Sequence, residues 1–323
     1  MKFLISSIRS LCSGFVALGF LASSAVAVPF DNDDFLVSTH ANGTIGVYDF
    51  DFTFKGFLDT GFNGVLGMDF LPNGNLLAAG RSPGRMKTYS STGAVVTDFT
   101  NANVGNVIDA KGSRDGTHFY AATQIGGAGI TEFTSAGSFV RNIGTKGYDG
   151  IAILPGNAMW GGSDNVLGVV EVFDLVTGAI QSTINLDNGQ QSAQSMFFSE
   201  STNSVLMTDI VTGDVFERDL NGSFLRKFDA PVAAAAFGVT RGPGGHVFSV
   251  VNGVVTEWLA DGTFVGTTTL ASSGRDTSII WAGNLNSVPE PASLALIGFG
   301  LAGIGFARRR RGMKRQEALR IGT

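Results

Sequence analysis

Cysteine, histidine and charged residues are scarce in this sequence of 323 residues. The single cysteine, Cys12, lies in an apolar segment near the N-terminus, and there are only three histidines. The rest of the chain therefore offers no cysteine nucleophile, no thiolate metal site and no disulfide. The sequence also lacks a glycine-rich phosphate loop, a serine nucleophile elbow and a metalloprotease helix. These absences disfavour the enzyme classes that depend on such groups.

Charge is low and unevenly distributed along the chain. Charged residues make up 15% of it, whereas 45 residues are glycine, a balance typical of short strands and tight turns rather than long solvated helices. Residues 28–287 contain 13 Lys and Arg against 25 Asp and Glu, a net charge of −12, while residues 308–320 contain seven Lys and Arg. An acidic body repels phosphate backbones, so the sequence predicts no nucleic-acid partner.

The N-terminus has the three parts of a secretion signal. Two basic residues in the first nine are followed by an apolar run over residues 11–21 and then by Ala25-Val26-Ala27. Small residues at Ala25 and Ala27 satisfy the rule for signal peptidase, so we expect residues 1–27 to be a signal peptide that is removed after Ala27. A lipoprotein signal at Cys12 is disfavoured because Arg9 stands where a lipobox requires hydrophobic residues.

The C-terminus combines a proline motif, an apolar helix and a basic cluster. Pro289-Glu290-Pro291 precedes an apolar stretch over residues 292–307, and Arg308, Arg309, Arg310 and Arg311 follow it. Sixteen helical residues are about 24 Å long, enough to cross a bilayer core of about 30 Å with local thinning. The arginines indicate the cytoplasmic side of the membrane. We therefore expect residues 312–323 to form a basic cytoplasmic tail and the body to lie on the opposite, outer side of that membrane.

This arrangement resembles the PEP-CTERM sorting signal of Gram-negative bacteria over residues 288–311. The resemblance implies that an exosortase recognises Pro289, Glu290 and Pro291, cuts nearby, and releases the protein or attaches it at the surface. It also implies a host that makes exopolysaccharide and biofilm. Members of this family usually end at the arginines, whereas this chain continues for twelve residues. We therefore expect a protein that is held transiently in the inner membrane and then secreted or displayed at the surface.

A repeat of about 40 residues runs through the body. An aromatic residue, a turn and an apolar exit recur around glycines 93, 137, 178, 222 and 262, which are spaced by 44, 41, 44 and 40 residues, and a further copy begins at Tyr48. A second hairpin unit precedes each copy, as in residues 68–79. Two hairpins per period indicate a four-stranded antiparallel unit, the blade of a β-propeller.

We therefore predict an all-β, six-bladed β-propeller over residues 28–287, with seven blades, a β-helix or a sandwich as alternatives. Residues 278–283 are expected to add a lone inner strand to the outer strands of residues 35–58, so that the two chain ends close one blade. The turn and strand pattern over residues 35–283 resembles the NHL, SMP-30 and YVTN propellers.

Four aspartates lie in or near the predicted inner strands: Asp69, Asp109, Asp149 and Asp276. Inner strands line the central channel, so converging carboxylates could bind calcium, which prefers oxygen ligands. The SMP-30 resemblance implies a channel metal in a hydrolase that opens lactones. The same aspartates could instead cap turns.

The sequence favours a non-enzymatic surface or matrix protein over an enzyme. Its expected partners are signal peptidase and exosortase during export, the membrane before processing, and a polysaccharide or surface protein afterwards. A metal-dependent hydrolase or lactonase of the SMP-30 type is the alternative, with calcium as the candidate cofactor.

Overall fold

The computed structural model describes residues 27–287, apart from residues 82–83, 102–103, 125–128, 163–166, 232–234 and 272–275. The predicted signal peptide up to residue 26 and the sorting signal from residue 288 onward lie outside the described residues. Within the described part, no helix is both long and apolar enough to span a membrane.

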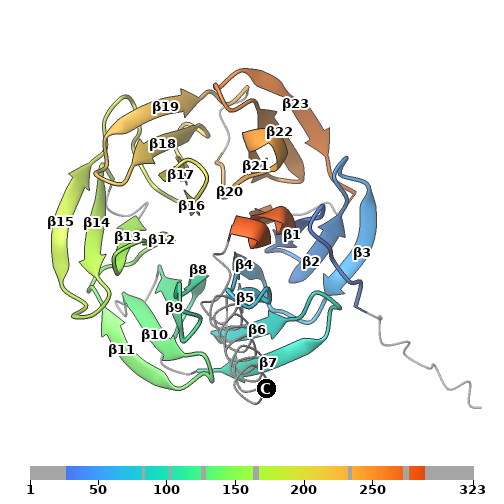
Figure 1. Ribbon diagram of the computed structural model, residues 1–323, viewed down its shortest axis with the longest axis horizontal. Helices are drawn as coiled ribbons and strands as arrows, with labels where there is room; N and C mark the ends of the chain where they lie inside the picture. The colour runs from blue at the N-terminus through green and yellow to red at the C-terminus, as the bar shows by residue number, and fades with distance from the viewer. Residues whose placement is uncertain are drawn as a thin grey trace, which may run out of the picture.

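The described strands form six four-stranded antiparallel sheets arranged around a central axis (Figure 1). Blade 1 contains β24 (Asp276–Trp281), β1 (Phe35–Thr39), β2 (Thr44–Tyr48) and β3 (Phe54–Asp59). Blade 2 contains β4 (Val65–Phe70), β5 (Leu76–Gly80), β6 (Arg85–Tyr89) and β7 (Val95–Thr100). Blade 3 contains β8 (Val107–Gly112), β9 (His118–Thr123), β10 (Ile130–Thr134) and β11 (Phe139–Ile143).

The remaining three blades have the same order of strands. Blade 4 contains β12 (Gly150–Leu154), β13 (Ala158–Gly162), β14 (Val169–Asp174) and β15 (Ile180–Asn185). Blade 5 contains β16 (Met196–Ser199), β17 (Ser204–Thr208), β18 (Val215–Asp219) and β19 (Phe224–Phe228). Blade 6 contains β20 (Gly238–Arg241), β21 (Val247–Val251), β22 (Val254–Trp258) and β23 (Phe264–Thr269). Two short 3-10 helices complete the described elements, η1 (Pro243–Gly245) and η2 (Ala282–Ser287).

The six-bladed propeller is confirmed, and so is its closure by the two chain ends. β24 pairs antiparallel with β1, with Phe35 opposite Trp281 and Val37 opposite Ile279. The predicted inner strand was placed slightly too late, because β24 ends at Trp281 and residues 282–283 belong to η2.

The repeated glycine has a physical reason in the turn between the third and fourth strands of a blade. Gly137 has a φ of 88°, a conformation that L side chains rarely adopt. A Cβ at Gly137 would also stand 2.6 Å from the ring of Phe99, on the outermost strand of the preceding blade. The glycine therefore allows both the turn and the close packing of one blade on the next.

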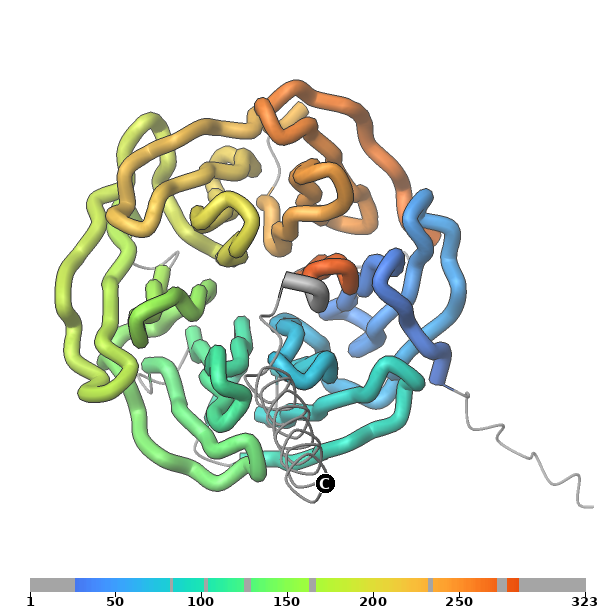
Figure 2. Tube along the Cα trace, in the orientation of Figure 1, coloured from blue at the N-terminus to red at the C-terminus, as the bar shows by residue number. Residues whose placement is uncertain are grey.

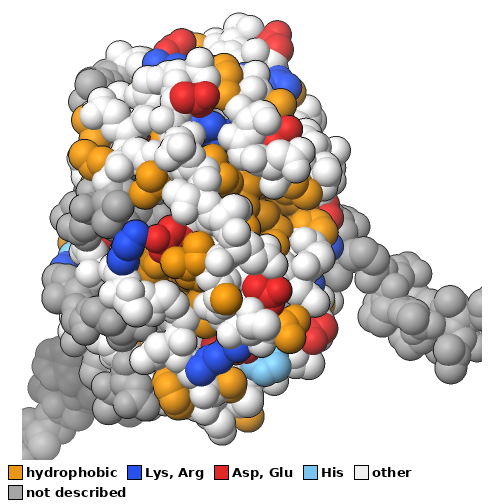
Figure 3. All heavy atoms as spheres, turned by 90° about the vertical axis from the view of Figure 1, so that its left-hand side faces the viewer, with side chains coloured by type: hydrophobic (Ala, Val, Ile, Leu, Met, Phe, Trp, Pro, Cys, Tyr) orange, Lys and Arg blue, Asp and Glu red, His pale blue; other side chains and the backbone are white. Residues whose placement is uncertain are grey.

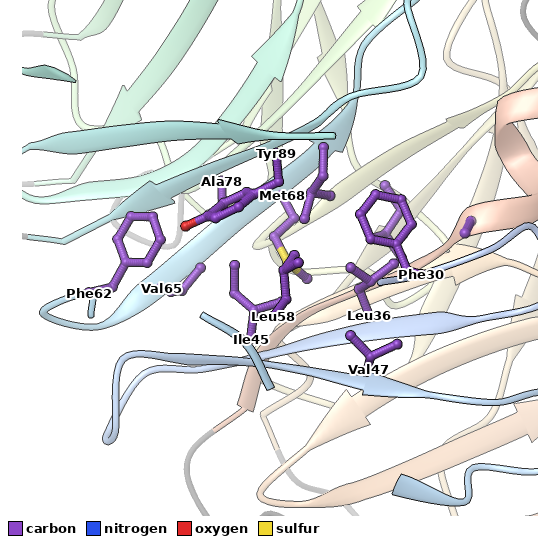
Figure 4. Close-up of a cluster of buried hydrophobic side chains, with 13 residues drawn as sticks. Phe30, Leu36, Ile45, Val47, Leu58, Phe62, Val65, Met68, Ala78 and Tyr89 are labelled. Carbon is purple, nitrogen blue, oxygen red and sulfur yellow. The ribbon is translucent and has the colours of Figure 1, made fainter. Parts of the chain in front are cut away.

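Apolar clusters fill the spaces between blades. In one of them, Leu36 and Ile45 of blade 1 pack with Met68 and Ala78 of blade 2 (Figure 4). Burial of one such aliphatic side chain contributes about 1.5–3 kcal/mol. Each blade is thus stabilised mainly by its neighbours.

The inner strands β24, β4, β8, β12, β16 and β20 surround the axis, and the outermost strands run around the circumference (Figure 2). We call the face on which the inner strands begin the N-face and the face on which they end the C-face. η2 follows directly on β24 and therefore lies at the C-face, close to the axis (Figure 1).

Candidate binding site at the C-face of the channel

A cavity lies at each end of the central channel. The cavity at the N-face has a volume of about 120 Å³ and is lined at the starts of the inner strands by residues such as Leu66 and Ile108. The cavity at the C-face, about 380 Å³, is lined at the strand ends by residues such as Gly112 and Trp281. Only the larger volume falls within the range of ordinary small-molecule sites, about 300–1,000 Å³.

Aromatic rings and a surface ion pair form one wall of the C-face cavity. Phe197 and Phe198 come from β16, and Trp281 comes from the end of β24. Arg114, in the turn after β8, pairs with Glu200 in the turn after β16, and its guanidinium carbon lies 5.7 Å from the centre of the Phe198 ring. Two turns from different blades are therefore held together across the cavity mouth.

Asp69 and Lys111 also line the C-face cavity. Lys111 Nζ donates to Asp109 Oδ1 at 2.7 Å, and the backbone N–H of Gly112 donates to Asp69 Oδ2 at 2.9 Å. Burial raises the pKa of Asp69 to about 6, although the positive charge of Lys111 acts in the opposite direction. The pKa of Asp109 is also raised, again chiefly by burial. Asp69 can therefore change its charge near neutral pH.

A buried ion pair supports the cavity between blades 5 and 6. Arg241 Nη2 donates to Glu217 Oε1 at 2.6 Å, and Arg226 Nε lies 2.9 Å from Glu217 Oε2. The Ser204 hydroxyl donates to Glu217 Oε1 at 2.5 Å. Sequence reasoning missed this cluster, because its members come from β17, β18, β19 and β20 and have no common spacing along the chain.

The structure separates the predicted aspartates along the channel axis. Asp69 lines the C-face cavity, whereas Asp109 and Asp149 line the N-face cavity. Asp276 begins β24, and its side chain lies outside the described part. Asp109 Oδ2 accepts a hydrogen bond of 3.0 Å from the backbone N–H of Ile151 in the next blade, so this carboxylate joins two blades.

The described residues contain no group of three or more His, Cys, Asp and Glu side chains placed to hold a metal ion. Calcium binding by the channel aspartates stays a prediction. The alternative role of capping turns does not describe Asp109, whose acceptor oxygens face Lys111, the backbone N–H of Ala110 and the next blade.

The N-face cavity is small and is lined by both polar and apolar side chains. His40 Nε2 and Arg81 Nη1 are 2.8 Å apart, and Gln194 and Phe237 are among the other residues that line the cavity with the two aspartates. These groups converge from several blades, but the space between them suits only a very small ligand.

The predicted processing residues lie at or beyond the two ends of the described chain. Ala25 and the sorting residues Pro289–Pro291 and Arg308–Arg311 lie outside it. Ala27 and Val28 lie against Gly93 of blade 2, and the backbone N–H of Val28 donates to the Phe57 carbonyl at 3.1 Å.

Comparison with known proteins places the two parts of the chain separately. A family model described as the PEP-CTERM protein-sorting motif matches residues 287–311. No curated protein matches the chain. Among solved structures, a chain from the crystal structure of a nidogen/laminin complex matches with a TM-score of 0.63 and 14% identity, covering 76% of this chain and 97% of the other.

The structural match at this identity shows the propeller fold alone. The motif implies processing by an exosortase and export to the cell surface, which is typical of Gram-negative bacteria. The chain is thus an exported protein that carries a PEP-CTERM sorting motif and a six-bladed propeller.

Proposed function

We propose that this protein is a non-enzymatic binding protein of the bacterial surface or biofilm matrix, and that its C-face cavity binds a polysaccharide. Signal peptidase removes residues 1–27, the helix over residues 292–307 holds the precursor in the inner membrane, and exosortase acts at Pro289-Glu290-Pro291. The observation that carries the proposal is the 380 Å³ cavity, which combines aromatic rings with hydrogen-bonding groups at the channel mouth.

The composition of the cavity wall supports a sugar ligand. Sugar rings have apolar faces that pack on aromatic rings, and hydroxyl groups that need directed polar partners. The aromatic surfaces come from Phe197, Phe198 and Trp281. The polar partners include Lys111 and Asn284.

The charges favour a neutral sugar over an acidic one. Lys111, Arg114 and Arg241 are each already paired with a carboxylate, namely that of Asp109, Glu200 or Glu217. The body carries a net charge of −12, which repels a polyanion. We therefore expect neutral oligosaccharides to bind better than those containing uronic acids.

The test is calorimetric titration of the processed protein with matched neutral and uronic-acid oligosaccharides. Phe198→Ala removes an aromatic surface from the cavity and should weaken binding of the neutral sugar by about 1.4 kcal/mol, or about ten-fold in Kd. The control is Phe139→Ala, since Phe139 is 44% exposed at the start of the outermost strand β11, away from the cavity.

Equal affinity in the two variants would contradict the assignment of the site. Tighter binding of the acidic sugar would contradict the charge argument. If no oligosaccharide binds while a surface protein of the same host does, the ligand is a protein and the polysaccharide proposal is wrong.

A further inference from the structure

The chain leaves the propeller at the rim of the C-face cavity. The side-chain amide of Asn284 in η2 donates to the Arg241 carbonyl at 3.1 Å, and the backbone N–H of Ala282 donates to the Asp34 carbonyl at 2.8 Å. Gly283 and Asn284 also line the cavity. The sorting motif begins at residue 287, so it is joined to the body beside the cavity mouth.

The connection between the body and the expected membrane helix is short. Ser287 is the last described residue, and the apolar stretch begins at residue 292. Five residue steps reach at most about 18 Å when fully extended. A folded body of about 260 residues has a radius of gyration of about 18 Å. A tether that starts near the centre of the C-face is therefore too short to pass around the body and present the N-face to the membrane.

The charges of the C-face oppose tight adhesion to lipid. The turns between third and fourth strands lie on this face, and aspartates 49, 51, 174, 219 and 261 lie in these turns or at the strand ends that lead into them. Bacterial inner membranes contain anionic lipids, and like charges repel across a Debye length of about 8 Å at physiological salt. The short tether should keep the face close to the membrane, while repulsion of the acidic turns keeps the face from inserting.

We propose that the C-face is turned toward the bilayer in the membrane-held precursor, so that the membrane screens the C-face cavity until the sorting signal is cut. This inference rests on the membrane anchoring in the proposed function. The polysaccharide site would then be closed to large ligands before processing and open afterwards. Cleavage would control when the protein can bind, and it requires no change in the fold.

Accessibility of single cysteines tests this orientation, because the chain after residue 27 has no cysteine of its own. Ser201→Cys places a thiol in an exposed turn at the C-face cavity, and Asn42→Cys places one in the exposed β1–β2 turn of the N-face. The precursor that has lost residues 1–27 but keeps its C-terminal tail, held in right-side-out inner-membrane vesicles without exosortase, is treated with a large maleimide-polyethylene glycol. We expect modification of Ser201→Cys to be several-fold slower than that of Asn42→Cys.

Two further measurements separate the orientation from the anchoring. After exosortase cleavage, or in detergent, the two thiols should react at similar rates. A flexible Gly-Ser linker of about 20 residues inserted after Ser287, with an r.m.s. span of about 25 Å, should speed the reaction of Ser201→Cys in vesicles. A small maleimide should label both sites at all stages, which verifies that both thiols are reactive.

The possible failures have different meanings. If alkaline carbonate extracts the full-length protein from the vesicles, the anchoring fails and the proposed function must be revised. If the protein resists extraction and both thiols react equally with the large reagent, the orientation is wrong while the anchoring stands.

Discussion

The inner and outer strands of the same blades meet opposite packing constraints. In the inner strand β4, a Cβ at Gly67 would overlap the backbone nitrogen of Ala110 in β8 and stand 2.7 Å from the Asp109 backbone. Gly238 in β20 meets the backbone of Ser278 in β24 in the same way, at 2.7 Å. In the outermost strand β23, by contrast, a Cβ at Gly266 would meet nothing within 4 Å. Neighbouring blades are therefore most tightly packed around the central axis.

The outermost strands begin with apolar side chains that are not buried. Phe264 is 47% exposed at the start of β23, and Val95, Phe139 and Ile180 have the equivalent position in other blades. Hydrophobic side chains accordingly gather on the outer wall of the ring (Figure 3). Substitutions at the wall should therefore change stability little, whereas the strands around the axis tolerate almost no added volume.

Removal of the closing inner strand should have the largest effect. Deletion of residues 278–283 removes Ile279 and Ile280, which are 2% and 4% exposed, together with the pairing of β24 with β1. Two buried isoleucines contribute about 3–6 kcal/mol, a large part of a total stability of about 5–15 kcal/mol. We expect loss of the cooperative thermal transition, measured by circular dichroism.

The matched control is a chain that ends after Ser287, which retains all six blades and should melt like the processed protein. An unchanged melting temperature for the deletion would show that the ring does not depend on its closure.

A single methyl group at the axis should have the next largest effect. Gly67→Ala forces backbone against backbone between β4 and β8, and overpacking of this kind costs about 1–3 kcal/mol. Gly266→Ala adds the same group to an open position in an outermost strand, where it should leave stability unchanged or raise it by about 0.5 kcal/mol. Urea unfolding of both variants measures the difference. Equal urea midpoints for the two variants would show that the inner strands are packed no more tightly than the outermost strands.

Much of the fold could be predicted because the propeller repeats a local pattern. The glycine of the third-to-fourth strand turn recurs in five of the six blades, and in blade 1 Phe52 takes its place with a φ of 64°. The leftover strand at residues 278–283 predicted the closure. The height of each inner-strand residue along the channel axis was harder to infer. In the strand pairing, Gly67 lies opposite Ala79 and Asp109 lies opposite Ala122, which has the equivalent place in its blade. Gly67 and Asp109 therefore lie at the same height along the channel axis.

The candidate site could not be predicted, because its parts come from turns of different blades that share no motif. Arg114 follows β8 and Phe198 belongs to β16, and only the closed ring brings them within contact. The aspartates were expected in or near the inner strands, but a shift of two residues in register moves a side chain to another level of the channel. Asp69 therefore lies at one mouth while Asp109 lines the cavity at the other.

The smallest of the predicted effects concerns pH and contrasts an aspartate at the axis with one at the wall. Burial raises the pKa of Asp69 to about 6, so the folded state keeps a proton that the unfolded state has lost between about pH 4 and pH 6. The free energy of unfolding should therefore fall as the pH rises through this range and then level off. A carboxyl pKa of about 6 in the folded state, against 3.8 for the free group, corresponds to at most about 3 kcal/mol of stability. Asp69→Asn should reduce this slope, leaving the part due to Asp109, whose pKa burial also raises.

Asp98 on the outermost strand β7 should behave in the opposite sense. Its hydrogen bond with Arg85 lowers the pKa of Asp98, so its contribution is present above the pKa of the unfolded state and is lost as the pH falls. Both side chains of this pair are exposed, and such pairs contribute well under about 1 kcal/mol. Urea unfolding from pH 4 to pH 7 compares Asp69→Asn and Asp98→Asn with the unmodified protein. If Asp69→Asn keeps the full slope, the raised pKa does not belong to Asp69, and a charged carboxylate is accommodated at the channel mouth without loss of stability.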